Sequence, residues 1–94
     1  MSDLDFKTKV AVDLAVRDYK TRESYCVRCA NPKQASNEIE ALGWSFSERD
    51  SDTNDGEIID VYLHDNHPGI ALIMMWNGWT GHVDVSACAV DDFN

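Results

Sequence analysis

An almost uninterrupted apolar run, Ile70 to Trp76, limits the folds open to this chain more than any other segment. A run of this length that ends at a turn signal is typical of a strand buried on both faces. The dipeptide Asn77-Gly78 follows it directly and is a hairpin signal. Residues 82–89 then alternate between apolar and polar side chains, which predicts the partner strand of this hairpin.

The clearest helix in the sequence lies between Asn31 and Gly43. Asn31 suits the N-cap position, Pro32 suits the first turn, and Gly43 can close the helix in a left-handed conformation. The apolar residues between them recur at helical spacing and form one stripe, made of Ala35, Ile39 and Leu42. We expect this stripe to pack on one face of a sheet.

Three further segments are predicted to be strands: residues 24–30, 44–48 and 58–64. Residues 6–17 fit two structures. Their apolar and polar side chains alternate, which favours a half-buried strand. A helix remains the alternative, because alanine is a poor strand former and five residues also share one helical face: Ala11, Val12, Ala15, Val16 and Tyr19.

These elements, with 6–17 counted as a strand, give the order ββαββββ. The sequence therefore predicts an α+β fold, a mostly antiparallel sheet of five or six strands with one helix packed on one face. Ninety-four residues support one modest core, so we expect a single domain over residues 1–94. Residues 91–94 are expected to form a frayed tail.

The chain is predicted to be cytoplasmic. No apolar run approaches the roughly 18 residues that cross a bilayer. The N-terminus reads Met-Ser-Asp-Leu-Asp, which is acidic where a signal peptide is basic and then apolar. Cys26, Cys29 and Cys88 make an odd count, as expected for thiols that are kept reduced in the cytosol.

Charge is distributed very unevenly along the chain. The first 33 residues hold seven Lys and Arg against five Asp and Glu, whereas the remaining 61 hold one basic residue, Arg49, against twelve acidic ones. Seven of those twelve fall between Glu48 and Asp65. Such a field repels nucleic acid and anionic membranes and attracts basic protein surfaces.

Two patterns of metal-ligating residues are present. Cys26-x-x-Cys29 and His64-x-x-His67 together supply the donors of a zinc site, but residues three apart on a strand point to opposite faces. The run from Asp50 to Gly56 resembles the first half of a calcium loop, yet it has Asp55 at the position of the usual glycine and lacks the closing glutamate. We therefore predict no bound metal and no cofactor.

The sequence offers little support for catalysis. No nucleophile-elbow glycine pattern surrounds a serine, no glycine loop suited to phosphate is present, and no activator accompanies the cysteines. We therefore expect a protein that is not an enzyme.

The leading hypothesis is a small binding module that acts on a basic protein surface. In its sharpest form the module is an inhibitor that presents carboxylates where a nucleic-acid-binding partner expects phosphates. Its size and charge are similar to those of phage-encoded counter-defence inhibitors, including anti-CRISPR and anti-restriction proteins, although no motif supports that likeness. The expected contacts are seven acidic residues and one aromatic anchor: Glu48, Asp50, Asp52, Asp55, Glu57, Asp60, Asp65 and Trp79.

Two alternatives come from other classes. One is a small domain that binds zinc or calcium. The other is a non-catalytic assembly subunit whose sheet edge pairs with another chain, for example as a homodimer.

Overall fold

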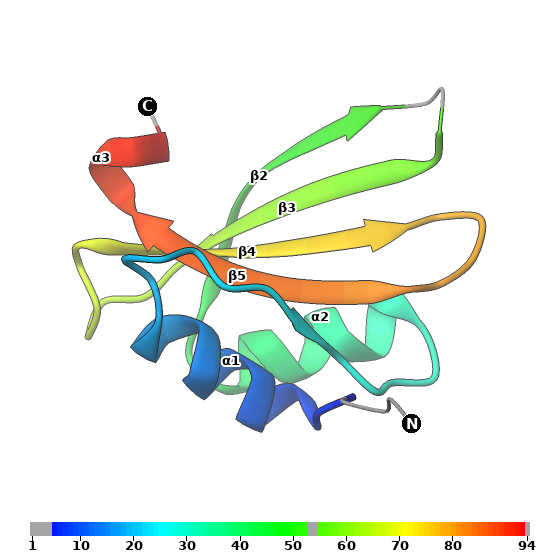
Figure 1. Cartoon of the computed structure of the whole chain (residues 1–94), viewed down its shortest axis with the longest axis horizontal. Helices are drawn as coiled ribbons and strands as arrows, with labels where there is room; N and C mark the ends of the chain where they lie inside the picture. Colours follow the sequence, from blue (N-terminus) through cyan, green and yellow to red (C-terminus); the bar gives the residue numbers. More distant parts are fainter. Residues whose placement is uncertain (1–4, 53–54, 94) are drawn as a thin grey trace.

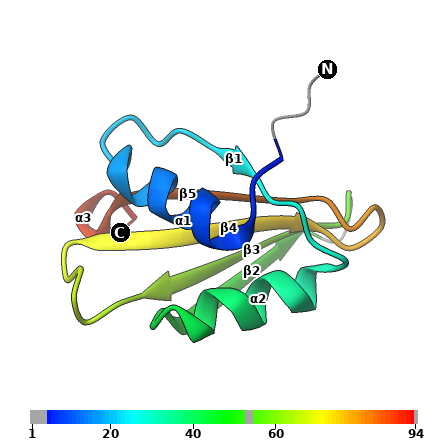
Figure 2. The same cartoon turned by 90° about the horizontal axis from the view of Figure 1, so that it is seen from below.

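The structure, a computed structural model, describes residues 5–52 and 55–93, with Asp52 and Phe93 described by their backbone alone. Five strands within these ranges form one antiparallel sheet in the order β1-β5-β4-β3-β2. Figures 1 and 2 show α1 and α2 side by side on one face of this sheet. The elements are α1 (Thr8–Arg17), β1 (Tyr25–Cys26), α2 (Pro32–Ala41), β2 (Ser45–Asp52), β3 (Glu57–Leu63), β4 (Ile70–Asn77), β5 (Val83–Ala89) and α3 (Val90–Phe93).

The predicted α+β class and the mostly antiparallel five-stranded sheet are confirmed. The apolar run forms β4, which lies between β3 and β5 and buries Leu72 and Met74 completely. The hairpin after it is longer than a tight Asn-Gly turn, because the Asn77 N–H donates to the His82 carbonyl and leaves four residues between them. The positive φ of this turn falls at Gly81 and not at Gly78.

Residues 6–17 do not form the favoured strand; the alternative, a helix, is correct. Ala11 and Ala15 are 0% exposed in α1, where they let the helix approach the sheet closely. The sequence pattern alone cannot reveal this, because these residues fit both the two-residue period of a strand and the 3.6-residue period of a helix. Packing against the sheet decides between the two structures. The predicted strand over residues 24–30 also shrinks, to Tyr25–Cys26 and one parallel bridge between Phe6 and Val27.

The predicted helix α2 is confirmed together with its ends. The Asn31 side chain accepts a hydrogen bond of 2.9 Å from the Gln34 N–H, and Pro32 opens the first turn. Gly43 has a φ of +101° just after the helix and lies against the ring of His64. A side chain at Gly43 would collide with that imidazole, so the glycine is required both by conformation and by space.

Apolar side chains gather on both faces of the sheet. The main core lies between the sheet and the two helices. A smaller cluster lies on the opposite face, which we call the open face, and consists of Val61, Ala71 and Cys88 with Ile59, Ile73 and Val90 against them. In the described ranges only the short α3 covers part of the open face (Figure 1). The predicted tail 91–94 begins inside α3, and Asn94 lies outside the described residues.

None of the helices in residues 5–52 and 55–93 is long and apolar enough to cross a membrane.

Candidate functional site

A bulge in β2 determines which charged side chains reach the open face. Phe46 pairs with Tyr62, but Glu48 pairs with Val61, so one extra residue stands in β2 between them. Since side chains alternate along a strand, the bulge puts Glu48 and Asp50 on the same face as Val61. Without it, Arg49 would take that face and the two acids would point toward the helices.

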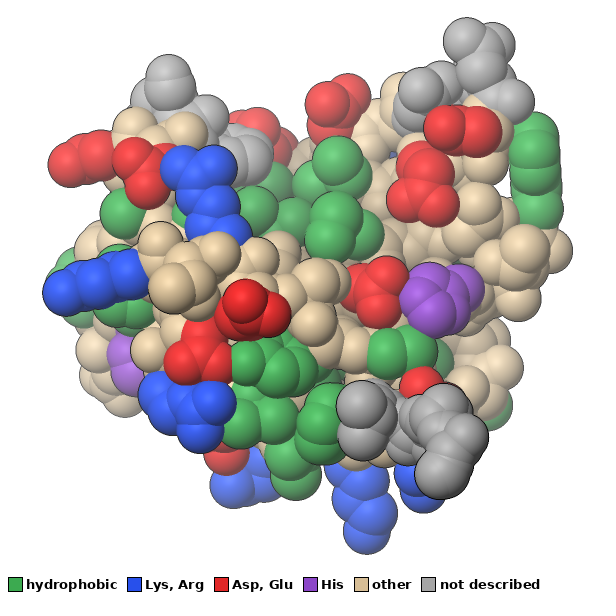
Figure 3. Space-filling view, viewed as in Figure 1, with side chains coloured by type: hydrophobic (Ala, Val, Ile, Leu, Met, Phe, Trp, Pro, Cys, Tyr) green, Lys and Arg blue, Asp and Glu red, His purple; other side chains and the backbone are tan. Residues whose placement is uncertain are grey.

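One row of the open face runs across all five strands. Asp50 pairs with Ile59, Ile59 with Met75, Met75 with Asp84, and Asp84 with Cys26. The apolar side chains therefore form the centre of the face, and the carboxylates stand toward its two edges. Figure 3 shows a notch at the top of the molecule in this view, with hydrophobic side chains in it and acidic side chains on either side.

Trp79 stands at one end of this face, where the tips of two hairpins meet. Its side chain is 71% exposed, and its ring lies against Gly56 in the turn between β2 and β3. The Gly78 N–H donates to the Gly56 carbonyl at 2.8 Å. The Asn77 amide adds bonds of 3.1 Å to the Asp55 carbonyl and 3.2 Å to Glu57 Oε2. The predicted anchor is thus next to two predicted acidic contacts.

Asp60 is not part of the acidic surface, and its predicted contact with a partner needs correction. Its carboxylate points toward the helix layer and is 1% exposed. Arg49 donates two hydrogen bonds to it, of 2.7 and 3.1 Å, and Trp76 Nε1 donates a third of 3.1 Å. The bond to Asp60 also raises the pKa of Arg49. Asp60 pairs with Arg49 across β2 and β3, so it faces opposite to Glu48 and Asp50.

The two remaining acidic candidates do not join this surface: one lies in another part of the fold, and the side chain of the other lies outside the described residues. Asp65 follows β3 at the end opposite to Glu57, and β3 itself spans about 20 Å at 3.3 Å per residue, so Asp65 belongs to another region. The side chain of Asp52 lies outside the described residues. So does part of the predicted calcium-like run, residues 53–54, and the structure therefore says nothing of that run as a site.

The structure does not bring together the two pairs considered as zinc ligands, Cys26 with Cys29 and His64 with His67. Cys29 packs against the main core, whereas Cys26 lies on the open face beside Asp84. His64 and His67 lie near Trp44, with ring centroids 5.0 and 5.5 Å from the indole. Both nitrogens of His64 are occupied, since Nε2 lies 3.1 Å from the Leu42 carbonyl and Nδ1 accepts from the Asn66 N–H at 3.0 Å.

Cys26 instead meets two residues that the sequence analysis did not combine with it. Its Sγ lies 3.9 Å from Nε2 of His82, and that nitrogen lies 3.0 Å from Oδ2 of Asp84. The spacing His82-x-Asp84 places both side chains on one side of the last strand, which was a usable signal. Burial, followed by a hydrogen bond with Asp5, raises the pKa of the Cys26 thiol to about 12. The thiol is therefore protonated at neutral pH and is no nucleophile.

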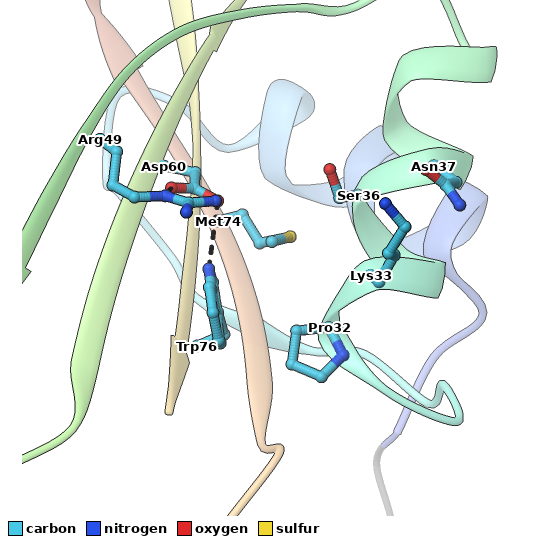
Figure 4. Close-up of a pocket in the computed structure, with 8 residues that line it drawn as sticks. All are labelled: Pro32, Lys33, Ser36, Asn37, Arg49, Asp60, Met74 and Trp76. Carbon is cyan, nitrogen blue, oxygen red and sulfur yellow. Dashed lines mark hydrogen bonds and ion pairs between the residues drawn. The ribbon is translucent and has the colours of Figure 1, made fainter. Parts of the chain in front are cut away.

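A pocket of about 250 Å³ lies between α2 and the sheet (Figure 4). In Figure 4, Arg49, Asp60 and Trp76 stand on the sheet side and face Pro32 and Ser36 of the helix. The buried carboxylate of Asp60 has three donors, and among the described residues no buried side-chain nitrogen or oxygen lacks a partner. The carboxylate in this pocket is therefore held by hydrogen bonds from Arg49 and Trp76.

No family model, curated protein or solved structure matches this chain. Inference about its function therefore depends on the geometry above.

Proposed function

We propose that this chain is a protein-binding module whose open sheet face docks on a basic surface of a partner protein. The observation that carries this proposal is the β2 bulge, because it holds Glu48 and Asp50 on the face that exposes Ile59, Ile73 and Met75. Carboxylates beside a partly exposed apolar strip are the complement of a cationic surface with an apolar centre.

Each part of the face has a distinct physical role in such a complex. The apolar strip contributes affinity through burial, at about 25 cal/mol for each Å² removed from water. The carboxylates steer a cationic partner toward the face and set its orientation. Trp79 is a large amphipathic side chain at the rim, and tryptophan is common among residues whose truncation weakens an interface most.

The finer form of the proposal is an inhibitor that occupies a nucleic-acid-binding groove, as the phage-encoded counter-defence proteins do. Adjacent strands lie about 4.8 Å apart and alternate residues about 7 Å apart, so carboxylates at fixed sheet positions form a rigid anionic array. Such an array competes with phosphates for Lys and Arg side chains. A cytoplasmic setting belongs to the same proposal and agrees with three free cysteines, all of which are described.

Capture of a partner from cell extract, at low and at high salt, tests the proposal. Two double variants are compared. The open-face variant carries Glu48→Lys and Asp50→Lys, and the helix variant, which is the control, carries Asp13→Lys and Glu40→Lys. We expect salt-sensitive capture by the natural chain and the helix variant, and loss of capture by the open-face variant. Equal capture by both variants would exclude the open face as the docking surface.

A competition experiment tests the finer form of the proposal, in which the module occupies a nucleic-acid-binding groove. Duplex or single-stranded nucleic acid added to the purified complex should displace the module from its partner if both occupy one groove. A partner that binds nucleic acid and the module at the same time would exclude mimicry, while the docking proposal itself would stand.

A further inference from the structure

Three different donor side chains meet at the β1–β5 edge of the open face. Cys26 and Asp84 are cross-strand partners, and His82 precedes Asp84 by two residues and so stands on the same side. One donor atom from each of the three lies within 4.8 Å of the other two. The cluster lies at the opposite edge of the sheet from the bulge in β2, and the proposed docking does not require it.

We propose that Cys26, His82 and Asp84 form a binding site for a zinc-like divalent transition-metal ion. Zinc–sulfur bonds of about 2.3 Å and zinc–nitrogen bonds of about 2.0 Å at tetrahedral angles place the two donors about 3.5 Å apart. The observed separation of Sγ and Nε2 is 3.9 Å, and a rotation of the His82 ring would direct Nε2 at an ion shared with Sγ. Nε2 and Oδ2 lie 3.0 Å apart, close to the corresponding distance of about 3.3 Å.

The surroundings of the cluster favour a cation. Asp84 itself places a carboxylate oxygen within the cluster. The side chain of His82 is 57% exposed, which leaves the ion a path from solvent. When the metal binds, the thiol loses its proton to water and the imidazole binds as the neutral base, as metal–thiolate coordination requires.

The donor set selects the class of metal. Thiolate and imidazole ligands suit zinc, cobalt and similar ions, whereas calcium and magnesium prefer sites made entirely of oxygen. A bound ion would also link β1, which has only two residues, to β5 through their side chains.

A catalytic cysteine is the competing interpretation of the same three residues. In a nucleophile–base pair, one imidazole nitrogen points at the sulfur. Here Sγ lies 4.0 Å from Nδ1 and 3.9 Å from Nε2 of His82, so neither nitrogen is directed at it. The Asp84 carboxylate beside the thiol favours a bound cation.

Cobalt titration of the untagged, reduced chain tests the site. We expect one equivalent of Co²⁺ to bind, with thiolate-to-metal charge-transfer absorption in the near ultraviolet, and Zn²⁺ to displace it while Ca²⁺ does not. Cys26→Ser should abolish the absorption, and His82→Gln should weaken binding roughly tenfold or more, comparable to losses from disturbing a metal's ligand environment.

Matched controls come from the same chain. Cys29→Ser removes a cysteine on the core side, and His67→Gln removes a histidine near Trp44; both should bind cobalt like the natural chain. Circular dichroism confirms that each variant is folded. Absence of saturable binding, or absorption that survives Cys26→Ser, would overturn the metal site. Partner capture is tested with substitutions in β2 and not in this cluster, so the metal site and the docking face can each fail without the other.

Discussion

Arg49 and Asp60 face each other across β2 and β3 and join through two hydrogen bonds of 2.7 and 3.1 Å. The Asp60 side chain is 1% exposed and that of Arg49 is 53% exposed, so the pair connects the edge strand to the interior. The Arg49 guanidinium carbon also lies 5.6 Å from the Trp76 ring and 5.8 Å from the Phe46 ring. The single basic residue of the acidic region therefore has a structural role.

Arg49→Met should destabilise the fold by about 1–3 kcal/mol, because it leaves a buried carboxylate with one donor, Trp76 Nε1. Urea denaturation measures this change in the free energy of unfolding. The exposed pair Lys9–Asp13 gives the control, since Lys9→Met should change stability by less than about 1 kcal/mol. Equal effects of the two substitutions would contradict a special role for the Asp60 pair.

Gly56→Ala should also destabilise the chain. Gly56 has a φ of +76°, and a Cβ there would come within 2.8 Å of the Trp79 ring. The left-handed conformation alone costs roughly 1–2 kcal/mol for a residue with a Cβ. Gly69→Ala is the matched control, because Gly69 has no positive φ and a Cβ added there would meet no atom within 4 Å, so thermal unfolding should barely change.

Trp79→Ala should weaken binding of the captured partner by about tenfold or more while leaving the unfolding temperature nearly unchanged. The ring is 71% exposed and contributes little to the core, whereas truncating an interface tryptophan commonly costs more than about 1 kcal/mol of binding free energy. Calorimetric titration against the purified partner measures the effect. Unchanged affinity would remove Trp79 from the interface.

Asp18 should make folding sensitive to acid. Hydrogen bonds from Arg17, and then from Tyr25, lower the pKa of its carboxyl below the ordinary value. The folded state therefore favours the ionised form, and its stabilisation is complete above an ordinary Asp pKa of about 4 and is lost as the pH falls through the lower folded-state value.

Unfolding curves measured from about pH 6 down to about pH 2 check this dependence. Asp18→Asn should flatten the loss of stability at low pH, whereas Asp13→Asn, at an exposed carboxylate with no hydrogen bond to a tyrosine, should preserve it. A profile that Asp18→Asn leaves unchanged would show that other carboxyls dominate the acid response.

The sequence by itself determined the elements whose signals are local. The apolar run predicted β4, and the cap, proline and closing glycine predicted α2, because each such signal acts within a few residues. The uneven charge was also visible in the sequence, and it led to Glu48, Asp50, Asp55 and Glu57, which lie on or beside the open face.

Only the tertiary structure decided which of these residues work together. Residues 6–17 form a helix that covers one face of the sheet with apolar side chains. A bulge after Phe46 turns Asp50 outward and places Arg49 opposite the inward-facing Asp60. Cys26 and His82 are 56 residues apart and meet only through the pairing of β1 with β5. Strand register and packing are long-range properties, so no local pattern could have specified them.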